Sequence, residues 1–249
     1  MIREIKILKH HGKQYINDLR NQAVSEKFRG RPEIEASISR SEIEMIHSVC
    51  PSGAIDESTG SIDMGRCVFC RECEFILPAK VRFHNDYRIA VNRREDLVIK
   101  PGNSNPVRLN ENKIRKEIRA LYRKSLKLRQ VSAGGDNSCE MELNASGNVN
   151  FDFGRYGVEF VASPRHADGI HVTGPISRNM KAALLSTYEA TPAPKVVIAV
   201  GSCALSGGPF RGSPEVAEGL DSLLPVDLFI PGCPPHPLTN LHALLNFFK

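Results

Sequence analysis

The sequence contains no tryptophan, and tyrosine and phenylalanine bring its aromatic share to only 6%. It also lacks a long apolar run, because the longest, Val196–Val200, is far shorter than the roughly 20 residues needed to cross a bilayer. The opening segment, MIREIKILKHHGK, has no apolar core of signal-peptide length. These absences argue against a membrane-spanning segment and against export, so we expect a cytoplasmic protein.

An excess of positive charge is confined to one segment. Residues 108–130 carry nine Lys or Arg against two acids, a balance of +7, whereas the rest of the chain has a balance of −2. Ile114, Ile118, Leu121 and Leu128 recur there near helical spacing, which predicts an amphipathic helix with a charged outer face. No nucleic-acid-binding module adjoins the segment, so we expect it to contact partner subunits or anionic lipid headgroups, and not nucleic acid.

The seven cysteines are an odd number in a chain without an export signal, which argues against a disulfide framework. Cys67, Cys70 and Cys73 have the C-x2-C-x2-C spacing that lets three thiolates bind one cubane iron–sulfur cluster. A ferredoxin supplies one more cysteine, followed by proline, from elsewhere in its fold, as Cys50-Pro51 would here. Residues 30–95 therefore resemble a bacterial-type ferredoxin domain that has kept the ligands of a single 4Fe–4S cluster.

Two other interpretations of this group stay open. The same four thiolates would make a structural zinc site, although zinc sites more often use two separated cysteine pairs. Cys67 and Cys70 alone would make a redox dithiol, but Cys50 and Cys73 would then have no role. Iron–sulfur proteins are brown and zinc proteins are colourless, so the colour of the protein separates these cases.

Turn-forming residues at 101–106 (PGNSNP) divide the chain into two regions. Upstream, Ser41 and Glu44 have the spacing of a capping box for a short helix, and Ile55 and Ile62 flank a turn that predicts a small hairpin. The expected division is residues 1–100 for a ferredoxin-like α+β domain with an N-terminal extension, 101–130 for the linker and basic helix, and 131–249 for a flavodoxin-like α/β domain.

The downstream region alternates short apolar strands with helical segments, which is typical of an open, mostly parallel α/β sheet. Ligands of such sheets bind beyond the carboxyl ends of the strands. Cys203 and Cys233 each follow the end of an expected strand. The strands are expected at 158–161, 169–173, 195–200 and 227–230, and a helix at 179–190.

Cys139, Cys203 and Cys233 are far apart in the sequence, so only a tertiary fold could bring them together. Glycines beside them would let the backbone approach a bulky inorganic ligand and donate N–H groups to its sulfurs. The residues expected to contact the ligand in this way are Gly201, Gly207, Gly208 and Gly232, with Pro234 stiffening the loop of Cys233.

From about residue 115 onward the chain resembles the small, cluster-bearing subunit shared by membrane-bound NiFe hydrogenases, formate hydrogenlyases and respiratory complex I. The formate hydrogenlyase branch is the nearest, because its first ligand pair is spaced C-x2-C before an acidic tripeptide. The resemblance implies a flavodoxin-like fold that holds a proximal iron–sulfur cluster. The segments that carry it are residues 125–131, 162–168, 172–180 and 187–192, together with the loops around Cys139, Cys203 and Cys233.

One position departs from the family pattern, because the first ligand is a cysteine in the family and Asp136 here. Three outcomes are open: Asp136 binds iron through a carboxylate oxygen in a 4Fe–4S cluster, the cluster loses that iron and becomes 3Fe–4S, or the site holds no cluster. The retention of Cys139, Cys203 and Cys233 favours an occupied site. Asp136 would otherwise serve as the N-cap of a helix.

Several acidic and basic residues near these segments have weaker claims to a role. Glu142 matches an acidic family position near the cluster and could transfer protons, or it is a solvated acid. His236 could contact the cluster, or it is a surface histidine. Arg165 and His166 match a family stretch in which a hydrogen bond that holds the fold is the better interpretation than chemistry. His10-His11 is expected to be solvated.

The resemblance implies an electron-transfer subunit without catalytic residues of its own. The ferredoxin-type cluster would exchange electrons with the proximal cluster, which docks on a large catalytic subunit that carries a NiFe centre or is a metal-free, complex I-like relative. Further iron–sulfur subunits and membrane subunits would place the protein peripherally on the inner face of the cell membrane. Two alternatives remain: a scaffold subunit that has lost the proximal cluster, and a zinc-stabilised nucleic-acid-binding module.

Overall fold

The structure is a computed structural model that describes residues 2–12, 14–121 and 125–248. Its helices are α1 (Ile2–His11), α2 (Arg40–Val49), α3 (Glu72–Ile76), α4 (Lys116–Leu121), α5 (Ser138–Ser146), α6 (Arg178–Ala190), α7 (Gly201–Ser206) and α8 (Pro237–Phe247). Its strands are β1 (Pro32–Ile34), β2 (Ile62–Asp63), β3 (Val81–Phe83), β4 (Val98–Ile99), β5 (Leu126–Ser132), β6 (Val158–Phe160), β7 (Gly169–Thr173), β8 (Val196–Val200) and β9 (Leu228–Ile230).

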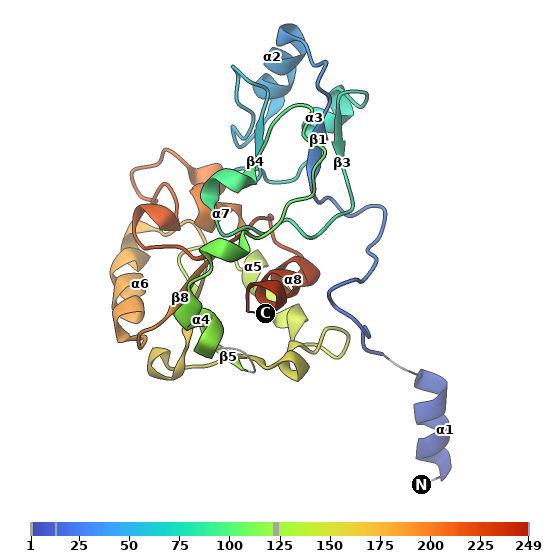
Figure 1. Ribbon diagram of the computed structural model, residues 1–249, viewed down its shortest axis with the longest axis vertical. Helices are drawn as coiled ribbons and strands as arrows, with labels where there is room; N and C mark the ends of the chain where they lie inside the picture. The colour runs from blue at the N-terminus through green and yellow to red at the C-terminus, as the bar shows by residue number, and fades with distance from the viewer. Residues whose placement is uncertain (1, 13, 122–124, 249) are drawn as a thin grey trace.

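The N-terminal half builds two small antiparallel sheets. Strand β1 pairs with β3, and β2 pairs with β4. A bridge between Ile55 and Ile62 closes the hairpin predicted from the sequence. Figure 1 shows these strands with α2 and α3 at one end of the molecule, while α1 stands apart from the rest of the chain.

The downstream half contains a five-stranded, fully parallel sheet of order β6-β5-β7-β8-β9. Numbered from its first strand this is the order 2-1-3-4-5, which defines the flavodoxin-like arrangement. The fold class predicted from the alternation of strands and helices is confirmed. The sheet begins at Leu126, inside the segment for which the sequence predicted a linker and a helix.

Helices cover both faces of this sheet. Ile170, Val172 and Ala199 pack in one buried cluster with Leu184 of α6 and Leu205 of α7. On the other face, strand residues pack with helices α4 and α8. The members of that second cluster include Val196, Ile198, Leu228, Ile118 and Phe247. Strands β7 and β8 are buried along their whole length. The continuous apolar sequence of β8, VVIAV, is typical of a strand covered on both faces, whereas β7 also buries His171 and Thr173.

The two halves share one core. The cluster that contains Ile170 and Ala199 also includes Met64 and Phe69 of the N-terminal half. A further link is a pair of backbone hydrogen bonds between Val91 and Phe229, which adds Val91 to the edge of the sheet at β9. The halves are therefore packed against each other through apolar contacts and backbone bonds.

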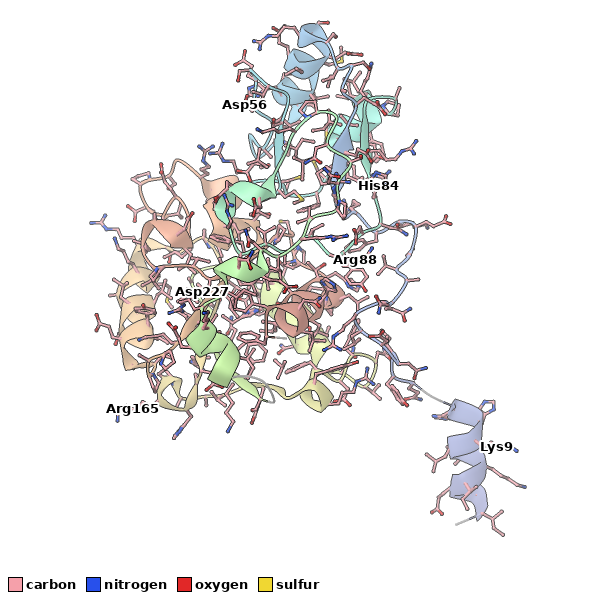
Figure 2. The ribbon with its side chains drawn as sticks, in the orientation of Figure 1. Lys9, Asp56, His84, Arg88, Arg165 and Asp227 are labelled. Carbon is pink, nitrogen blue, oxygen red and sulfur yellow. The ribbon has the colours of Figure 1, made fainter. Side chains whose placement is uncertain are left out.

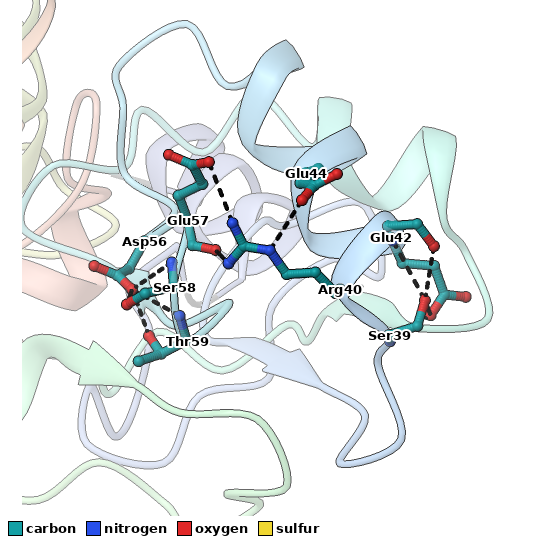
Figure 3. Close-up of polar contacts among 9 residues, drawn as sticks. Ser39, Arg40, Glu42, Glu44, Asp56, Glu57, Ser58 and Thr59 are labelled. Atoms are coloured by element: carbon teal, nitrogen blue, oxygen red, sulfur yellow. Dashed lines mark hydrogen bonds and ion pairs between the residues drawn. The ribbon is translucent and has the colours of Figure 1, made fainter.

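The capping box of α2 lies two residues before the predicted one. Ser39 is the N-cap: its side chain accepts a hydrogen bond from the Glu42 N–H, and the Glu42 carboxylate accepts one from the Ser39 N–H (Figure 3). The prediction of Ser41 and Glu44 was therefore wrong. Glu44 instead accepts a hydrogen bond from Arg40 one turn earlier on the helix surface.

The long basic helix predicted for residues 108–130 was also wrong in extent. The helix α4 covers only Lys116–Leu121, residues 122–124 lie outside the described part of the chain, and Leu128 belongs to β5. Burial alternates at the start of β5, so Leu126 and Leu128 face the core while the residue between them is exposed. Leu128 also fits the helical spacing that begins with Ile114 and Ile118. The sequence pattern alone therefore does not show where the helix ends and the strand begins.

The N-terminal helix α1 was not predicted from the sequence. None of its residues is buried, and His10 and His11 are exposed as expected. Within the described residues, no helix combines the length and the apolar character that a bilayer crossing demands.

A buried histidine links β7 to α8. His171 is 0% exposed, and its Nε2–H donates to Asn240 Oδ1 at 3.2 Å. Burial lowers the pKa of His171 to about 4, although the charge of Glu140 and the Asn240 hydrogen bond partly oppose the shift. The imidazole is therefore neutral in the folded protein at neutral pH.

This histidine should make stability depend on pH. As the pH falls below 6.5, His171 gains a proton in the unfolded chain but stays neutral in the folded chain. Protonation therefore stabilises the unfolded chain, and the free energy of unfolding falls until the pH reaches about 4. Between pH 7 and pH 5 the free energy of unfolding should fall by about 2 kcal/mol from this residue. Urea unfolding at both pH values measures the loss. His171→Gln should abolish it, and His10→Gln, at an exposed site, should retain it; equal pH dependence in all three proteins would contradict the assignment.

Candidate metal centres

The four cysteines of the N-terminal half line a single pocket. Cys50, Cys67, Cys70 and Cys73 all contribute to its wall. Cys50 follows the end of α2, and Cys73 lies within α3. Apolar side chains complete the wall, among them Ile55, Ile62 and Phe83. The structure therefore brings together the whole ligand set that the sequence proposed for the first cluster.

The backbone between these cysteines turns back on itself. Phe69 and Arg71 adopt left-handed conformations, with φ of 54° and 71°, which residues other than glycine rarely do. The Phe69 N–H donates to Cys67 Sγ and the Ala54 N–H to Cys50 Sγ, both at 3.3 Å. Strained backbone and N–H groups aimed at sulfur are features of sites that hold anionic ligands. No sequence signal marked Phe69 or Arg71, because neither is a residue type that favours this conformation.

Burial keeps the thiols of Cys67 and Cys73 protonated when no metal is bound, because it raises the pKa of both. Desolvation raises the pKa of Cys67 and raises that of Cys73 to about 12, and repulsion from the neighbouring cysteines adds to both shifts. A thiolate here needs a compensating positive charge. A bound metal supplies this charge, and the thiol then loses its proton. The donor set thus fits a metal centre better than a free redox dithiol.

A zinc ion and a cubane cluster require different spacings of the four thiols. Within the described residues, no three His, Cys, Asp or Glu side chains converge closely enough to bind one ion. A zinc site would draw four thiolates to about 2.3 Å from one atom. A cubane keeps its thiolates farther apart, because iron and sulfide lie between them.

The second group lies at the carboxyl-end edge of the parallel sheet. Cys139 is in the first turn of α5, which follows β5, and Cys203 is in α7, which begins directly after β8. Cys233 lies in the loop between β9 and α8 and is exposed. Parallel strands bring their carboxyl ends to one edge, which is where ligands bind in sheets of this type.

Two glycines make room for the thiols of this group. A Cβ atom on Gly201 would lie 2.7 Å from Cys139 Sγ, and one on Gly208 would lie 2.8 Å from Cys203 Sγ. Both positions also have positive φ, at 84° and 56°. The nearby cysteine thiol is therefore what excludes a larger side chain at each of these two positions. The contact of these glycines with a ligand stays a prediction.

The other predicted backbone residues shape the loops. Gly207 closes α7 in a left-handed conformation, and a Cβ on Gly232 would lie 2.5 Å from Pro235 Cα. Pro234 follows Cys233 through a cis peptide bond. These residues fix the course of the two cysteine loops.

Electrostatic effects show that the second group shares one environment. Burial raises the pKa of Cys139, and the charges of Glu140, Cys203, Cys233 and Asp136 raise it further. Burial also raises the pKa of Cys203 to about 11, again with contributions from Cys233 and Asp136. Three thiols and one carboxylate are thus close enough to repel one another, as the ligands of one cluster would be before metal enters.

Asp136 has a structural role in addition to its place beside the thiols. Its Oδ1 accepts hydrogen bonds from the Ser138 N–H at 3.1 Å and the Ser138 hydroxyl at 2.6 Å, which lower the pKa of Asp136. The N-cap of α5 is Asn137, so the prediction of Asp136 as N-cap was wrong by one residue. Because both bonds use Oδ1, that oxygen can support the helix while Oδ2 binds a metal.

A cleft lies between the segment that carries Cys67 and Cys70 and the loop that carries Cys233. Val68 and Phe69 line it on one side, and Gly232, Cys233 and Pro234 on the other. Glu142 and His236 also line this cleft. The first cysteine group is therefore adjacent to the loop that carries Cys233.

Glu142 and His236 are both partly buried there. Burial raises the pKa of Glu142 and lowers that of His236. His236 Nδ1 accepts the Leu238 N–H at 3.1 Å and caps α8, and its ring packs edge-on against Phe28 and Phe151. It is thus a packed helix cap and not the surface histidine considered from the sequence.

Arg165 and His166 lie away from both cysteine groups. Their side chains are exposed or half-exposed, and Figure 2 shows Arg165 at the end of the sheet domain opposite the N-terminal half. The hydrogen bond that holds this stretch comes from Asp168, whose Oδ2 accepts the Lys127 N–H at 2.7 Å. The fold-holding role expected of Arg165 and His166 belongs to their neighbour.

Comparison with known proteins identifies relatives of the downstream half. The profile of the family described as "NADH ubiquinone oxidoreductase, 20 Kd subunit" matches residues 137–247. A probable membrane-bound hydrogenase subunit, mbhJ, of Pyrococcus furiosus is 44% identical over 46% of this chain and 69% of its own. A subunit of NADH-quinone oxidoreductase from Roseiflexus sp. is 46% identical over 45% of this chain, and the match spans only 42% of that relative's length.

A solved structure also aligns with part of the chain. It is the membrane-bound sulfane sulfur reductase, described as an archaeal respiratory membrane complex. One of its chains aligns with a TM-score of 0.45 and 29% identity over 53% of this chain and 71% of its own.

Gly201→Ala should disturb the second centre specifically. Its Cβ would displace Cys139 Sγ, so iron bound at the second centre, roughly four atoms per chain, should be lost on anaerobic reconstitution. Iron and acid-labile sulfide analysis measures the loss. Gly212→Ala is the matched control, because Gly212 has φ of 85° but nothing within 4 Å of its Cβ position. Both variants carry backbone strain of roughly 1–2 kcal/mol, so equal iron contents in the two would show that the thiol does not need this space.

Proposed function

Since the chain belongs to the family of the 20 kDa subunit of NADH ubiquinone oxidoreductase, we propose that it is an iron–sulfur electron-transfer subunit of a membrane-associated hydrogenase or complex I-like oxidoreductase. The observation that carries the proposal is the pairing of two cysteine groups. Four cysteines line one pocket, and three more meet Asp136 at the adjacent edge of the sheet. Two neighbouring redox centres would let the chain pass electrons from one partner to another across its own fold.

The protein's own residues prepare both sites for cluster binding. In the first, Cys50, Cys67, Cys70 and Cys73 would hold a 4Fe–4S cluster, and the N–H groups of Ala54 and Phe69 would stabilise its negative sulfur atoms. Apolar walls exclude water from the pocket. A bound cluster supplies reversible one-electron chemistry, and the residues around it set its position and potential.

In the second site, Cys139, Cys203, Cys233 and Asp136 would hold a 4Fe–4S or 3Fe–4S cluster. A carboxylate in place of a thiolate changes the charge and hydrogen bonding at one iron, so the potential of this site would differ from that of an all-cysteine relative. Gly201 and Gly208 leave the space in which the thiols lie.

We infer the partner subunits from the relatives of this chain and from the exposure of Cys233. Cys233 is exposed, so a large catalytic subunit, of the NiFe hydrogenase or the complex I type, would cover this edge of the sheet and exchange electrons there. Further iron–sulfur subunits would serve the first centre. Membrane subunits would hold the assembly peripherally on the inner face of the cell membrane, in line with a relative that is named as a membrane-bound hydrogenase subunit.

A second candidate function follows from the hydrogen bonds of Asp136. Because Oδ1 is already engaged by Ser138, the carboxylate can serve α5 alone. In that case the downstream half would be an assembly scaffold without a proximal cluster, and the first centre would be the chain's one redox group.

Iron content separates these two functions. After anaerobic reconstitution the two-cluster chain should bind about eight iron atoms, or about seven with a three-iron cluster, and the scaffold about four. Cys139→Ser should change the electron paramagnetic resonance spectrum of the two-cluster chain. An unchanged spectrum together with about four iron atoms would exclude the proximal cluster and support the scaffold.

Asp136→Asn tests whether the carboxylate binds iron. Asparagine keeps the Oδ1 acceptor for Ser138, so α5 should lose little stability, roughly 0.5 kcal/mol or less. If Asp136 is a ligand, the variant should show an altered resonance spectrum and lower iron content at the second centre. Asp136→Cys should restore the ligand type of the family. An Asp136→Asn protein with wild-type iron content and spectrum would show that Asp136 only supports the helix.

A further inference from the structure

One buried hydroxyl connects the two cysteine groups. Ser202 is the second residue of α7, directly before Cys203, and is 1% exposed. Its Oγ–H donates to the backbone carbonyl of Cys67 at 2.6 Å, although the two residues are 135 positions apart. Cys67 of the first group is thus in direct contact with Ser202, the chain neighbour of Cys203 in the second group.

The geometry commits this hydroxyl to Cys67. Ser202 Oγ also lies 3.1 Å from the Gly232 carbonyl, but that carbonyl already accepts the Ser202 N–H at 2.9 Å. A hydroxyl has a single proton, and the shorter contact with the Cys67 carbonyl is the stronger bond. Among the described residues no other donor reaches the Cys67 carbonyl.

The contact ties together three loops that carry cysteines. Through its side chain Ser202 holds the loop of Cys67, through its backbone N–H it holds the residue before Cys233, and along the chain it precedes Cys203. Around it, the contacts between the halves are mostly apolar, from Phe69, Ala204 and Leu205. Apolar contacts permit small sliding movements, whereas a buried hydrogen bond fixes one register.

We propose that Ser202 is a positioning residue that sets the separation of the two metal centres and provides the hydrogen-bonded route between them. The proposal rests on the proposed function and adds to it the residue that couples the centres. The route runs from Cys67 Sγ along its backbone to the carbonyl, across the Ser202 hydroxyl, and along one peptide unit to Cys203 Sγ. With both sites occupied, one electron would pass from the reduced centre, which is thereby oxidised, to the other centre, and the Ser202 hydroxyl would keep its proton. A one-electron donor protein would supply the electron and an acceptor subunit would remove it.

Ser202→Ala tests this role, with Ser146→Ala as the control. Ser146 is also 1% exposed, and its hydroxyl donates to the Glu142 carbonyl within α5, so the control removes a buried helix hydroxyl without touching the contact between the halves. Ser202→Ala leaves the Cys67 carbonyl buried without a donor. Amide hydrogen exchange in residues 66–70 should then accelerate about tenfold, since an unpaired buried acceptor weakens the local structure by that order. Ser146→Ala should leave exchange in that segment unchanged.

A second readout follows the electron. In reconstituted protein, flash photoreduction followed by optical spectroscopy measures the rate of transfer between the centres, and the magnetic splitting of the doubly reduced protein reports their separation. Ser202→Ala should slow the transfer several-fold and reduce the splitting. Ser202→Thr retains the hydroxyl and should recover the transfer rate relative to alanine, which a purely steric role of the side chain would not produce.

The outcomes distinguish this proposal from the proposed function. The role of Ser202 would be overturned if the Ser202→Ala variant kept the wild-type rate of amide hydrogen exchange in residues 66–70. It would also be overturned if the variant kept the wild-type electron-transfer rate and magnetic splitting. Either result would leave the proposal of two clusters in place. If wild-type protein binds only about four iron atoms, the two-cluster function fails, and hydrogen exchange still decides whether Ser202 positions the loop of Cys67. A threonine variant that behaves like alanine would also overturn the proposal.

Discussion

The parallel pairing of β5, β7, β8 and β9 is the constraint on which the second cysteine group depends. Each strand of a parallel sheet ends at the same edge, so the segments that follow β5, β8 and β9 all begin there. Cys139, Cys203 and Cys233 lie in those three segments. The buried, β-branched sequences of β7 and β8 hold this edge rigidly, because they are packed by helices on both faces. A cluster site assembled from distant residues needs that rigidity.

The N-terminal half packs onto the same edge and so brings the first group beside the second. Met64 and Phe69 enter the core of the sheet domain, and Val91 extends its hydrogen bonding at β9. Desolvation at this junction raises the pKa values of Cys67 and Cys139. The same desolvation strengthens the N–H···S and Ser202 hydrogen bonds, since each bond is worth more where water is excluded. The junction thus serves both the stability of the fold and the proposed transfer of electrons.

Asp136 combines a structural contact with a place beside the thiols of the second group. A cysteine at this position could not accept the two Ser138 hydrogen bonds as strongly as a carboxylate does. The carboxylate therefore strengthens the first turn of α5, which carries Cys139, and under the proposed function it would also offer iron a harder ligand than a thiolate.

Local pattern was enough for the first group and for the class of the fold. The spacing of Cys67, Cys70 and Cys73 predicts that these thiols lie together, because only a few backbone dihedrals separate them, and the structure places them in one pocket with Cys50. The apolar run of β8 predicts a strand buried on both faces of a parallel sheet. Sequence pattern failed where two local solutions are close in energy: Ser39 and Ser41 both suit a cap, and the leucines of β5 continue a helical spacing. Only the tertiary structure decided that β5 is a strand, that Ser202 meets Cys67, and that the two cysteine groups adjoin. Each of these depends on contacts between residues far apart in the chain, and their free energy comes from burying the two halves against each other.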